Sequence, residues 1–178
     1  AMDDRGTPVK GVLYGGFMAT KDGPKLLEYN VRFADPESMN VLPILEDDFV
    51  DLCMRTARDG LPLRARFARK ATVCKYVVPP GYGTHPKAGE QLKVDEGSIR
   101  STGAQLYYAA VDERSGHVYT TTSRALAVVG IADALARAEA VSEEALAFIS
   151  GSFYARRDIG KPDIVHRKVE RMKALRGS

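Results

Sequence analysis

The chain has 178 residues, of which 44% are hydrophobic and 28% charged, and its formal net charge is +3. This is the composition of a globular protein with one domain or two small ones, and no apolar run is long enough to cross a bilayer. The first residues lack the apolar core of a signal peptide, and two isolated cysteines give no zinc motif. We therefore expect a cytoplasmic protein whose two thiols are buried and reduced.

The positive charge is concentrated at the end of the chain. Residues 161–178 hold six basic and two acidic side chains, so the preceding sequence is close to neutral. A basic domain is the usual mark of a nucleic-acid-binding protein, and a short basic tail is not. We expect a solvated terminal helix here, with no nucleic-acid partner and no membrane partner.

The first predicted element is a β-hairpin. Residues 9–20 form an apolar run with two glycines, Asp22 and Gly23 follow, and residues 25–31 have the composition of a return strand. Asp-Gly between two such segments is a typical hairpin turn. We predict an antiparallel pair of strands in which the return strand, Leu26–Val31, is buried.

A helix is predicted after the hairpin. Pro36 and Pro43 bracket a loop or short turn, and apolar residues then recur with helical spacing from Glu46 to Asp59. Acidic residues stand in the first turn of this segment, and Gly60 is placed to end the helix. Residues 61–70 are basic and include a proline, which predicts a connector into a second unit.

The second unit is predicted to be a small antiparallel β structure with one helix. Short runs typical of strands lie at residues 71–78, 91–94, 104–112, 117–121 and 126–131. Ser115 and Gly116 predict a tight turn between two of these strands. Apolar residues along one stripe predict a helix over residues 132–149, and the whole pattern predicts an α+β fold.

Polar side chains follow one another along the return strand of the hairpin. Alternate residues of a strand share a face, so Glu28, Asn30 and Arg32 are expected to project together, with Asp35 and Glu37 in the loop that follows. Carboxylate and amide oxygens beside a guanidinium suit a magnesium ion that bridges nucleotide phosphates. An edge strand with one solvated polar face gives the same alternation, so the spacing leaves both interpretations open.

Two longer motifs carry a family resemblance. The segment from Gly11 to Glu37 resembles the last third of the ATP-grasp domain of phosphoribosylamine–glycine ligases, also called glycinamide ribonucleotide synthetases. Far downstream, the segment from Tyr154 to Gly160 resembles the closing motif of the same family, in the expected order. Within it, we expect Arg156, Arg157 and Asp158 to anchor the end of the chain against the other domain rather than to take part in the chemistry.

The resemblance implies a domain organisation. Residues 1–60 would be the C-terminal part of an ATP-grasp domain, with the metal- and phosphate-binding strand and loop. Residues 61–160 would be the β-rich C-terminal domain with its packed helix, and residues 161–178 a basic tail. The chain is then expected to be a fragment that lacks most of the ATP-binding half and is inactive alone, as a monomer or weak homodimer.

The resemblance also implies a reaction and its co-substrates. Enzymes of this family ligate glycine to 5-phosphoribosylamine in purine biosynthesis, giving glycinamide ribonucleotide, ADP and phosphate through a glycyl phosphate. Small molecules would be the partners: ATP, glycine and 5-phosphoribosylamine, with Mg or Mn as the cofactor. By the family pattern Glu28 and Asn30 ligate the metal, and Arg32 steadies the transferred phosphoryl group as the catalytic and substrate-binding cation. Asp35 and Glu37 would meet the amine-bearing or ribose portion of the substrate.

The sequence departs from the family pattern in the loop after the strand. Ala34 stands where the family usually has glycine, which indicates that no positive φ is needed there. Ser38 and Met39 stand where the family has Thr-Gln, so any substrate hydrogen bond made by that glutamine amide is in doubt.

Two other functions remain open. The chain could belong to another ATP-grasp carboxylate–amine ligase with a different acid or amine, since the Glu-x-Asn-x-Arg chemistry is shared across that superfamily. It could also be a non-catalytic binding module, which an absence of nucleotide turnover in the intact protein would favour.

Overall fold

The computed structural model describes residue 6 and residues 9–177 of the chain. Residues 1–5, 7, 8 and 178 lie outside the described part. The predicted domain 1–60 and the predicted tail 161–178 are therefore described except at these residues. The chain divides into two compact units, one made of the residues up to Arg69 together with those from Val169 onward, the other of Lys70–Lys168. We call the first the hairpin unit and the second the two-sheet unit, and describe each by itself.

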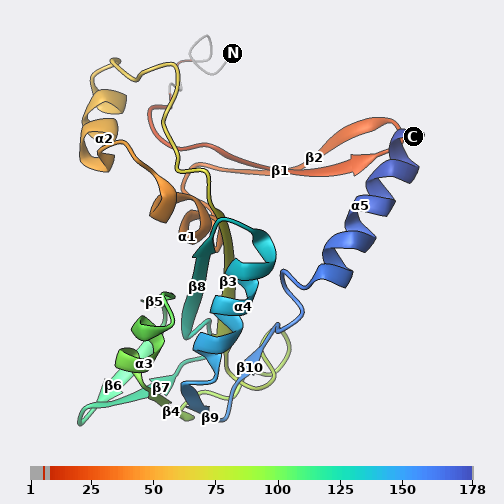
Figure 1. The fold of residues 1–178 in the computed structure, drawn as a ribbon. Helices are drawn as coiled ribbons and strands as arrows, with labels where there is room; N and C mark the ends of the chain where they lie inside the picture. The colour runs from red at the N-terminus through yellow and green to blue at the C-terminus, as the bar shows by residue number, and fades with distance from the viewer. Residues whose placement is uncertain (1–5, 7–8, 178) are drawn as a thin grey trace. The chain divides into compact units, whose positions relative to one another are not determined.

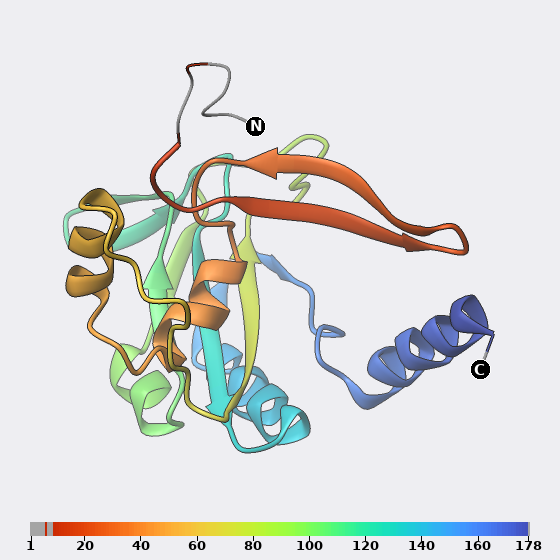
Figure 2. The ribbon, with the colours of Figure 1, turned by 90° about the horizontal axis from the view of Figure 1, so that it is seen from above.

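The hairpin unit begins with the predicted antiparallel pair. Strand β1 is Tyr14–Thr20 and strand β2 is Gly23–Asn30, and the two form a sheet of two strands (Figure 2). The turn occupies residues 21 and 22, and Gly23 has a φ of 92°, a value that glycine adopts without strain. The hairpin prediction is confirmed.

The prediction that the return strand is buried is wrong. Leu27 and Val31 have 64% and 63% of their surface exposed, and Tyr29 has 55%. A strand is buried only where a second layer covers its face, and the described residues of the hairpin unit place no such layer over β2. The apolar sequence that resembled a core strand is therefore exposed surface in this chain.

Three short helical segments follow the hairpin. Helix α1 is Glu37–Val41, a 3-10 turn η2 covers Leu42–Ile44, and helix α2 is Phe49–Ala57. The side chain of Asp48 caps α2 by accepting a hydrogen bond of 2.7 Å from the backbone N–H of Asp51. Helix α2 is thus shorter than the predicted span of 46–59, because its cap lies two residues inside that span.

The predicted connector is held against the rest of its own unit. Leu45 and Phe67 form an isolated antiparallel bridge, and the backbone N–H of Glu46 donates to the carbonyl of Arg66 at 3.0 Å. The guanidinium of Arg66 pairs in turn with Asp47 at 2.7 Å. The segment after α2 therefore returns alongside the link between η2 and α2.

The two-sheet unit contains two four-stranded antiparallel sheets. The first has the order β10-β3-β8-β5, with bounds Tyr154–Ala155, Ala71–Val78, Leu126–Ala132 and Gln105–Tyr108. The second has the order β6-β7-β4-β9, with bounds Val111–Arg114, His117–Thr120, Gln91–Val94 and Ile149–Gly151. The predicted α+β class is confirmed.

Most predicted strands of this unit are present, and one is divided. The span 104–112 becomes β5 in one sheet and β6 in the other, because the backbone crosses between sheets at Ala109 and Ala110. The predicted turn is confirmed at Ser115 and Gly116, which have φ values of 51° and 76° between β6 and β7.

Two helices pack within the two-sheet unit. Helix α4, Leu135–Leu146, lies along β3 and β8 (Figure 1) and is shorter at both ends than the predicted span. A Cβ on Gly130 of β8 would lie 1.9 Å from the Ala138 carbonyl oxygen, so glycine is what lets the helix approach this strand. Helix α3, Glu96–Ser101, was not predicted, although Asp95 caps it in the usual way through the Ser98 N–H.

One core unites the two sheets and the helices. Its fully buried members are Val77, Ile99, Ala125, Leu126, Val128, Ala145 and Leu146. The chain then ends with helix α5, Pro162–Arg176, in which no residue is buried. Within the described residues, no helix has the length and apolar character needed to cross a membrane.

Candidate functional site

The polar side chains of β2 form a hydrogen-bonded chain. The amide N–H of Asn30 donates to Glu28 Oε1 at 2.9 Å, and the guanidinium of Arg32 donates to Asn30 Oδ1 at 3.3 Å. A second guanidinium nitrogen of Arg32 donates to the Phe33 carbonyl at 2.9 Å. The prediction that Glu28, Asn30 and Arg32 project on one face is therefore confirmed, and we call these three residues the polar triplet.

A β-bulge determines which residues of β1 share the face of the triplet. The ladder pairs Tyr14 with Asn30 and Gly16 with Glu28, but it then shifts so that Phe17 pairs with Leu26 and leaves Leu27 as the extra residue. Directly paired residues of an antiparallel ladder lie on the same face. Tyr14 therefore lies on the face of the polar triplet.

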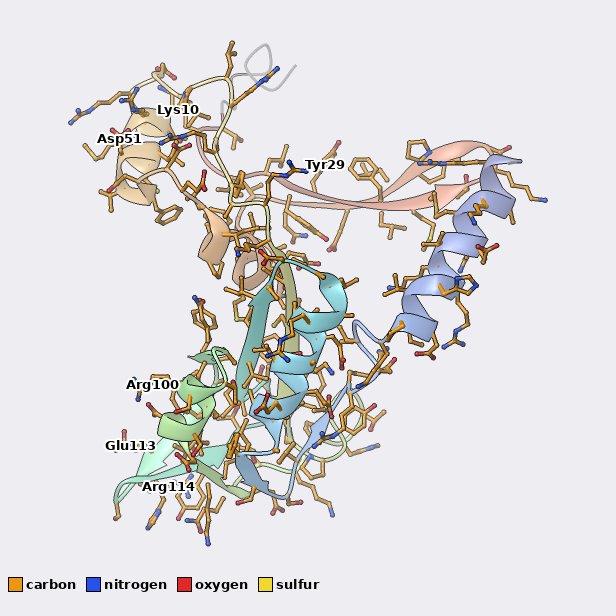
Figure 3. The ribbon with its side chains drawn as sticks, in the orientation of Figure 1. Lys10, Tyr29, Asp51, Arg100, Glu113 and Arg114 are labelled. Carbon is orange, nitrogen blue, oxygen red and sulfur yellow. The ribbon has the colours of Figure 1, made fainter. Side chains whose placement is uncertain are left out.

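The other face of the hairpin is apolar. Phe17 and Tyr29 pack edge to face with ring centroids 6.2 Å apart, and a Cβ on Gly15 would lie 2.6 Å from the Phe17 ring. Glycine at position 15 thus makes room for this aromatic pair. Tyr29, labelled on the hairpin in Figure 3, marks the face opposite the triplet.

The loop after β2 brings a second carboxylate to the triplet's side of the hairpin. Glu37 opens α1 and accepts a hydrogen bond of 3.1 Å from the hydroxyl of Tyr14, 23 residues earlier in the chain. Asp35 is exposed in the same loop, two residues before Glu37. Hydrogen bonds and strand pairing therefore bring Glu28, Asn30, Arg32 and Glu37 to one side of the hairpin, with Tyr14 as the residue that the sequence did not reveal.

Two carboxylates influence the phenol of Tyr14. The hydrogen bond to Glu37 is the main cause that raises the pKa of Tyr14, followed by the negative charge of Glu37, burial and the charge of Glu28. Each of these favours the neutral phenol. Tyr14 therefore keeps its proton at neutral pH and acts as a hydrogen-bond donor.

The loop tolerates alanine where a glycine was expected. Ala34 is buried and is not among the residues with positive φ, which confirms that the backbone needs no glycine there. Its carbonyl accepts the N–H of Ser38 at 2.9 Å, and the carbonyl of Pro36 accepts the N–H of Met39 at 2.9 Å. These backbone bonds hold the start of α1 next to the triplet.

A hollow in the hairpin unit has a different chemistry. It has a volume of about 540 Å³ and is lined mainly by apolar side chains, among them Phe33, Leu42, Leu45, Phe49 and Phe67. Such a lining suits apolar contact and offers few partners for a phosphate. Cys53 also lines this hollow and is exposed, so the expectation of two buried thiols holds for Cys74 and is wrong for Cys53, which lies on the open face of α2.

The closing motif is tied into the two-sheet unit by a buried ion-pair cluster. Lys75 is fully buried and donates to Glu139 at 2.7 Å, to Glu143 at 2.6 Å and to the Arg157 carbonyl at 3.0 Å. Arg157 also pairs with Glu143, and Lys161 pairs with Glu139 at 2.9 Å. We call these five residues the Lys75 cluster. It anchors the motif to its own unit, so the expectation that these contacts would be made with the other domain is wrong for Arg157.

The electrostatics of the cluster follow from its pairing. Burial alone would raise the pKa of Glu139 and of Glu143, but hydrogen bonds from the neighbouring cations outweigh burial and lower the pKa of both. Beside the cluster, the hydrogen bond from Arg156 lowers the pKa of Asp158 to about 2. All of these carboxylates are therefore ionised at neutral pH.

Two family models match separate parts of the chain, one on each side of the boundary at Arg69 and Lys70, and residues 39–71 lie between the two matches. Residues 1–38 match the ATP-grasp (A) domain of phosphoribosylglycinamide synthetase, and residues 72–162 match the C domain of the same enzyme. The polar triplet lies in the first match and the Lys75 cluster lies in the second.

Several relatives are similar over nearly the whole chain. The phosphoribosylamine–glycine ligase of Methanocaldococcus jannaschii is 51% identical over 168 residues, which is 94% of this chain and 38% of the relative. That of Methanocella arvoryzae is 50% identical over 175 residues, covering 98% of this chain and 40% of the relative. The chain thus spans about two fifths of the length of these relatives.

A solved structure has the same fold. The crystal structure of the phosphoribosylamine–glycine ligase from Thermotoga maritima superposes with a TM-score of 0.66 at 27% identity, over 82% of this chain and 36% of that one. Together with the C-domain match, which covers about half of the sequence, the relatives establish the family. The chain belongs to the phosphoribosylglycinamide synthetase family of ATP-grasp ligases.

Proposed function

We propose that this chain forms the C-terminal part of an ATP-dependent carbon–nitrogen ligase that joins glycine to 5-phosphoribosylamine. ATP would phosphorylate the glycine carboxylate, and the amine would then displace phosphate from the glycyl phosphate to give glycinamide ribonucleotide. The observation that carries the proposal is the hydrogen-bonded triplet Glu28–Asn30–Arg32 within the segment matched to an ATP-grasp domain.

The donor set of the triplet fits a divalent metal. Glu28 offers a carboxylate and Asn30 an amide oxygen, and both are hard oxygen ligands that suit Mg or Mn. Among the described residues no group of three or more His, Cys, Asp or Glu side chains is placed to hold a metal, so phosphate or water oxygens would complete the shell. When bound, the ion would neutralise the ATP phosphates and the charge that develops during transfer.

Arg32 would be the catalytic cation. In this structure its guanidinium donates to Asn30 Oδ1, the oxygen that we assign to the metal. Release from that oxygen would leave the exposed guanidinium available to the transferred phosphoryl group, where a planar, permanently charged fork binds well. Arg32 would thereby bind the substrate phosphate as well as stabilise its transfer.

The loop carboxylates would bind the second substrate. Asp35 and Glu37 are exposed in the loop that follows the triplet, and Glu37 reaches Tyr14 on the triplet's side of the hairpin, so the two carboxylates would meet the amine or the ribose hydroxyls of 5-phosphoribosylamine. Carboxylates accept hydrogen bonds from both groups. A substrate hydrogen bond made by the amide of the family's glutamine would have no counterpart here, since Met39 stands at that position, whereas Ser38 keeps the hydroxyl of the family's threonine.

The domain assignment of the chain is part of the proposal. Residues 1–60 would complete the ATP-grasp domain, residues 61–160 would form the C-terminal domain, and residues 161–178 would be a basic tail. We propose a cytoplasmic protein that binds neither nucleic acid nor membranes. Expressed as these 178 residues, it would be inactive and remain a monomer or weak homodimer.

Release of ADP tests this function. The enzyme to assay is the longer ligase that carries these residues, with this chain alone in parallel. We expect ADP release that requires both glycine and 5-phosphoribosylamine, disappears with EDTA and returns with Mg or Mn, while this chain alone releases none. ADP release that does not depend on glycine would indicate another ATP-grasp ligase with a different acid or amine. No ADP release at all would favour a non-catalytic binding module.

A further inference from the structure

We propose that Tyr14 is a positioning residue that holds the Glu37 carboxylate in the orientation needed to bind the amine substrate. The inference rests on the proposed function, because that function gives Glu37 its role. The hydroxyl of Tyr14 donates to Glu37 Oε1 at 3.1 Å and joins β1 to the first residue of α1. No other described hydrogen bond links the side chain of Glu37 to β1 or β2.

The bulge in the hairpin is what makes this contact possible. With the turn at residues 21 and 22, an unbroken ladder would pair Tyr14 with Tyr29 and so place Tyr14 on the apolar face. The extra residue Leu27 shifts the pairing by one position, and Tyr14 lies instead opposite Asn30. Bulges commonly re-aim a side chain beside an active site, and this one turns Tyr14 toward the polar triplet.

Glu37 needs such a partner because little else restrains it. Its side chain is exposed, and it opens a helix of five residues in which no residue is buried. A free glutamate of this kind has several rotatable bonds, and ordering them on binding costs affinity. A donor on the adjacent rigid hairpin removes part of that cost before the substrate arrives.

Tyr14 also connects the two halves of the proposed site. It is paired with Asn30, a proposed metal ligand, and it touches Glu37, a proposed ligand of the amine substrate. The phenol therefore fixes the distance between the strand that would serve ATP and the loop that would serve the amine. A 1 Å change in such a distance is enough to lower the rate of a bimolecular transfer.

Four variants of the longer ligase test the role: Tyr14→Phe, Glu37→Ala, the double variant and Tyr29→Phe. Tyr29→Phe is the matched control, because it removes the same hydroxyl from the same hairpin on the opposite face. For Tyr14→Phe we expect the KM for 5-phosphoribosylamine to rise about 5- to 10-fold, since one hydrogen bond to a charged group is lost. The KM for ATP should stay within about 2-fold, because the triplet is unchanged.

The double variant separates positioning from other effects. If Tyr14 acts through Glu37, the KM for 5-phosphoribosylamine of the double variant equals that of Glu37→Ala alone, because alanine removes the oxygen that accepts from Tyr14. Multiplicative effects, or an unchanged KM in Tyr14→Phe, would overturn the inference. An equal loss in Tyr29→Phe would also overturn it, because the effect would then belong to the hairpin as a whole.

A second readout does not depend on activity. In the 178-residue chain, side-chain NMR couplings of Glu37 report its rotamers, and we expect Tyr14→Phe to broaden the rotamer distribution while Tyr29→Phe leaves it unchanged. A Glu37 side chain that keeps one rotamer without the Tyr14 hydroxyl would contradict the positioning role. Tyr14→Phe could broaden the Glu37 rotamer distribution while the longer ligase shows no dependence on 5-phosphoribosylamine. In that case the contact between Tyr14 and Glu37 would be real and the proposed function would be wrong.

Discussion

The hairpin exposes its charged side chains to solvent, whereas the two-sheet unit buries a charged side chain and pairs it fully. On the hairpin, Glu28 and Arg32 are exposed and joined through one amide, whereas Lys75 in the two-sheet unit is fully buried among two carboxylates and a carbonyl. Exposed charges contribute little to folding and remain available to a ligand. Buried and fully paired charges cannot be removed singly without a large loss of stability. The difference in burial fits the chemistry that we propose for the hairpin and a structural anchoring role for the Lys75 cluster.

The largest effect is expected from breaking the Lys75 cluster. Lys75→Met leaves Glu139 and Glu143 with fewer cationic partners in a buried setting, and we expect the two-sheet unit to lose about 3–5 kcal/mol of unfolding free energy. Urea unfolding followed by far-UV circular dichroism measures the loss. Lys70→Met is the control, since its pair with Asp133 is exposed, and an equal loss there would contradict the contrast between buried and exposed pairs.

The same leucine-to-alanine change should separate the two regions. Leu126 is fully buried in the core, so Leu126→Ala should cost about 2–5 kcal/mol through lost contact and the cavity it leaves. Leu27 is 64% exposed, and Leu27→Ala should change stability by less than about 0.5 kcal/mol. Urea midpoints of the two variants give the comparison, and similar midpoints would show that the hairpin is buried in solution.

A methyl group added at Gly130 tests the packing of α4 on β8. The new Cβ would meet the Ala138 carbonyl oxygen at 1.9 Å, so the helix must shift, and we expect Gly130→Ala to cost about 1–3 kcal/mol. Gly97→Ala in α3 is the control, because its nearest contact is at 3.5 Å and alanine favours a helix. In thermal unfolding, the midpoint of Gly97→Ala should equal or exceed that of the parent chain. A Gly130→Ala midpoint equal to that of the parent chain would mean that α4 lies farther from β8 than the structure shows.

Lowering the pH should reduce the unfolding free energy of the two-sheet unit gradually, and by less than the substitutions described above. The pKa values of Glu139 and Glu143 are lowered in the folded state, so their contribution is present above the ordinary glutamate pKa and is lost as the pH falls through the folded values. Asp158, with a pKa of about 2, loses its charge last. We expect unfolding free energy to fall from about pH 5 downward, and to fall less steeply in Lys75→Met. A stability that rises in this range would reverse the assigned sign.

Local sequence rules predicted the parts of the molecule that depend on neighbours in the chain. The Asp22-Gly23 turn and the two-residue period of a strand were enough to place the hairpin and to bring Glu28 and Asn30 to one face. Burial of β2 could not be predicted in the same way, because it depends on a second layer and not on the strand's own apolar residues.

Long-range contacts account for what the sequence did not predict. Tyr14 joins the site only because the extra residue Leu27 shifts the ladder, and no periodicity in the sequence marks that bulge. Lys75 lies in a strand that was predicted correctly, but its partners are more than 60 residues away on α4. Helix α3 was the one missed element with a local signal, since Asp95 is a normal helix cap.

One measurement on Glu28→Ala tests the division of roles most directly. Its urea midpoint is taken in this chain, and its ADP release with glycine and 5-phosphoribosylamine is taken in the longer ligase. We expect a midpoint equal to that of the parent chain and a fall in turnover on the order of 10²-fold or more, because Glu28 is exposed and its proposed role as a metal ligand serves charge stabilisation and not folding. Unchanged turnover, or a midpoint that falls as far as that of Lys75→Met, would contradict the assignment of chemistry to the hairpin.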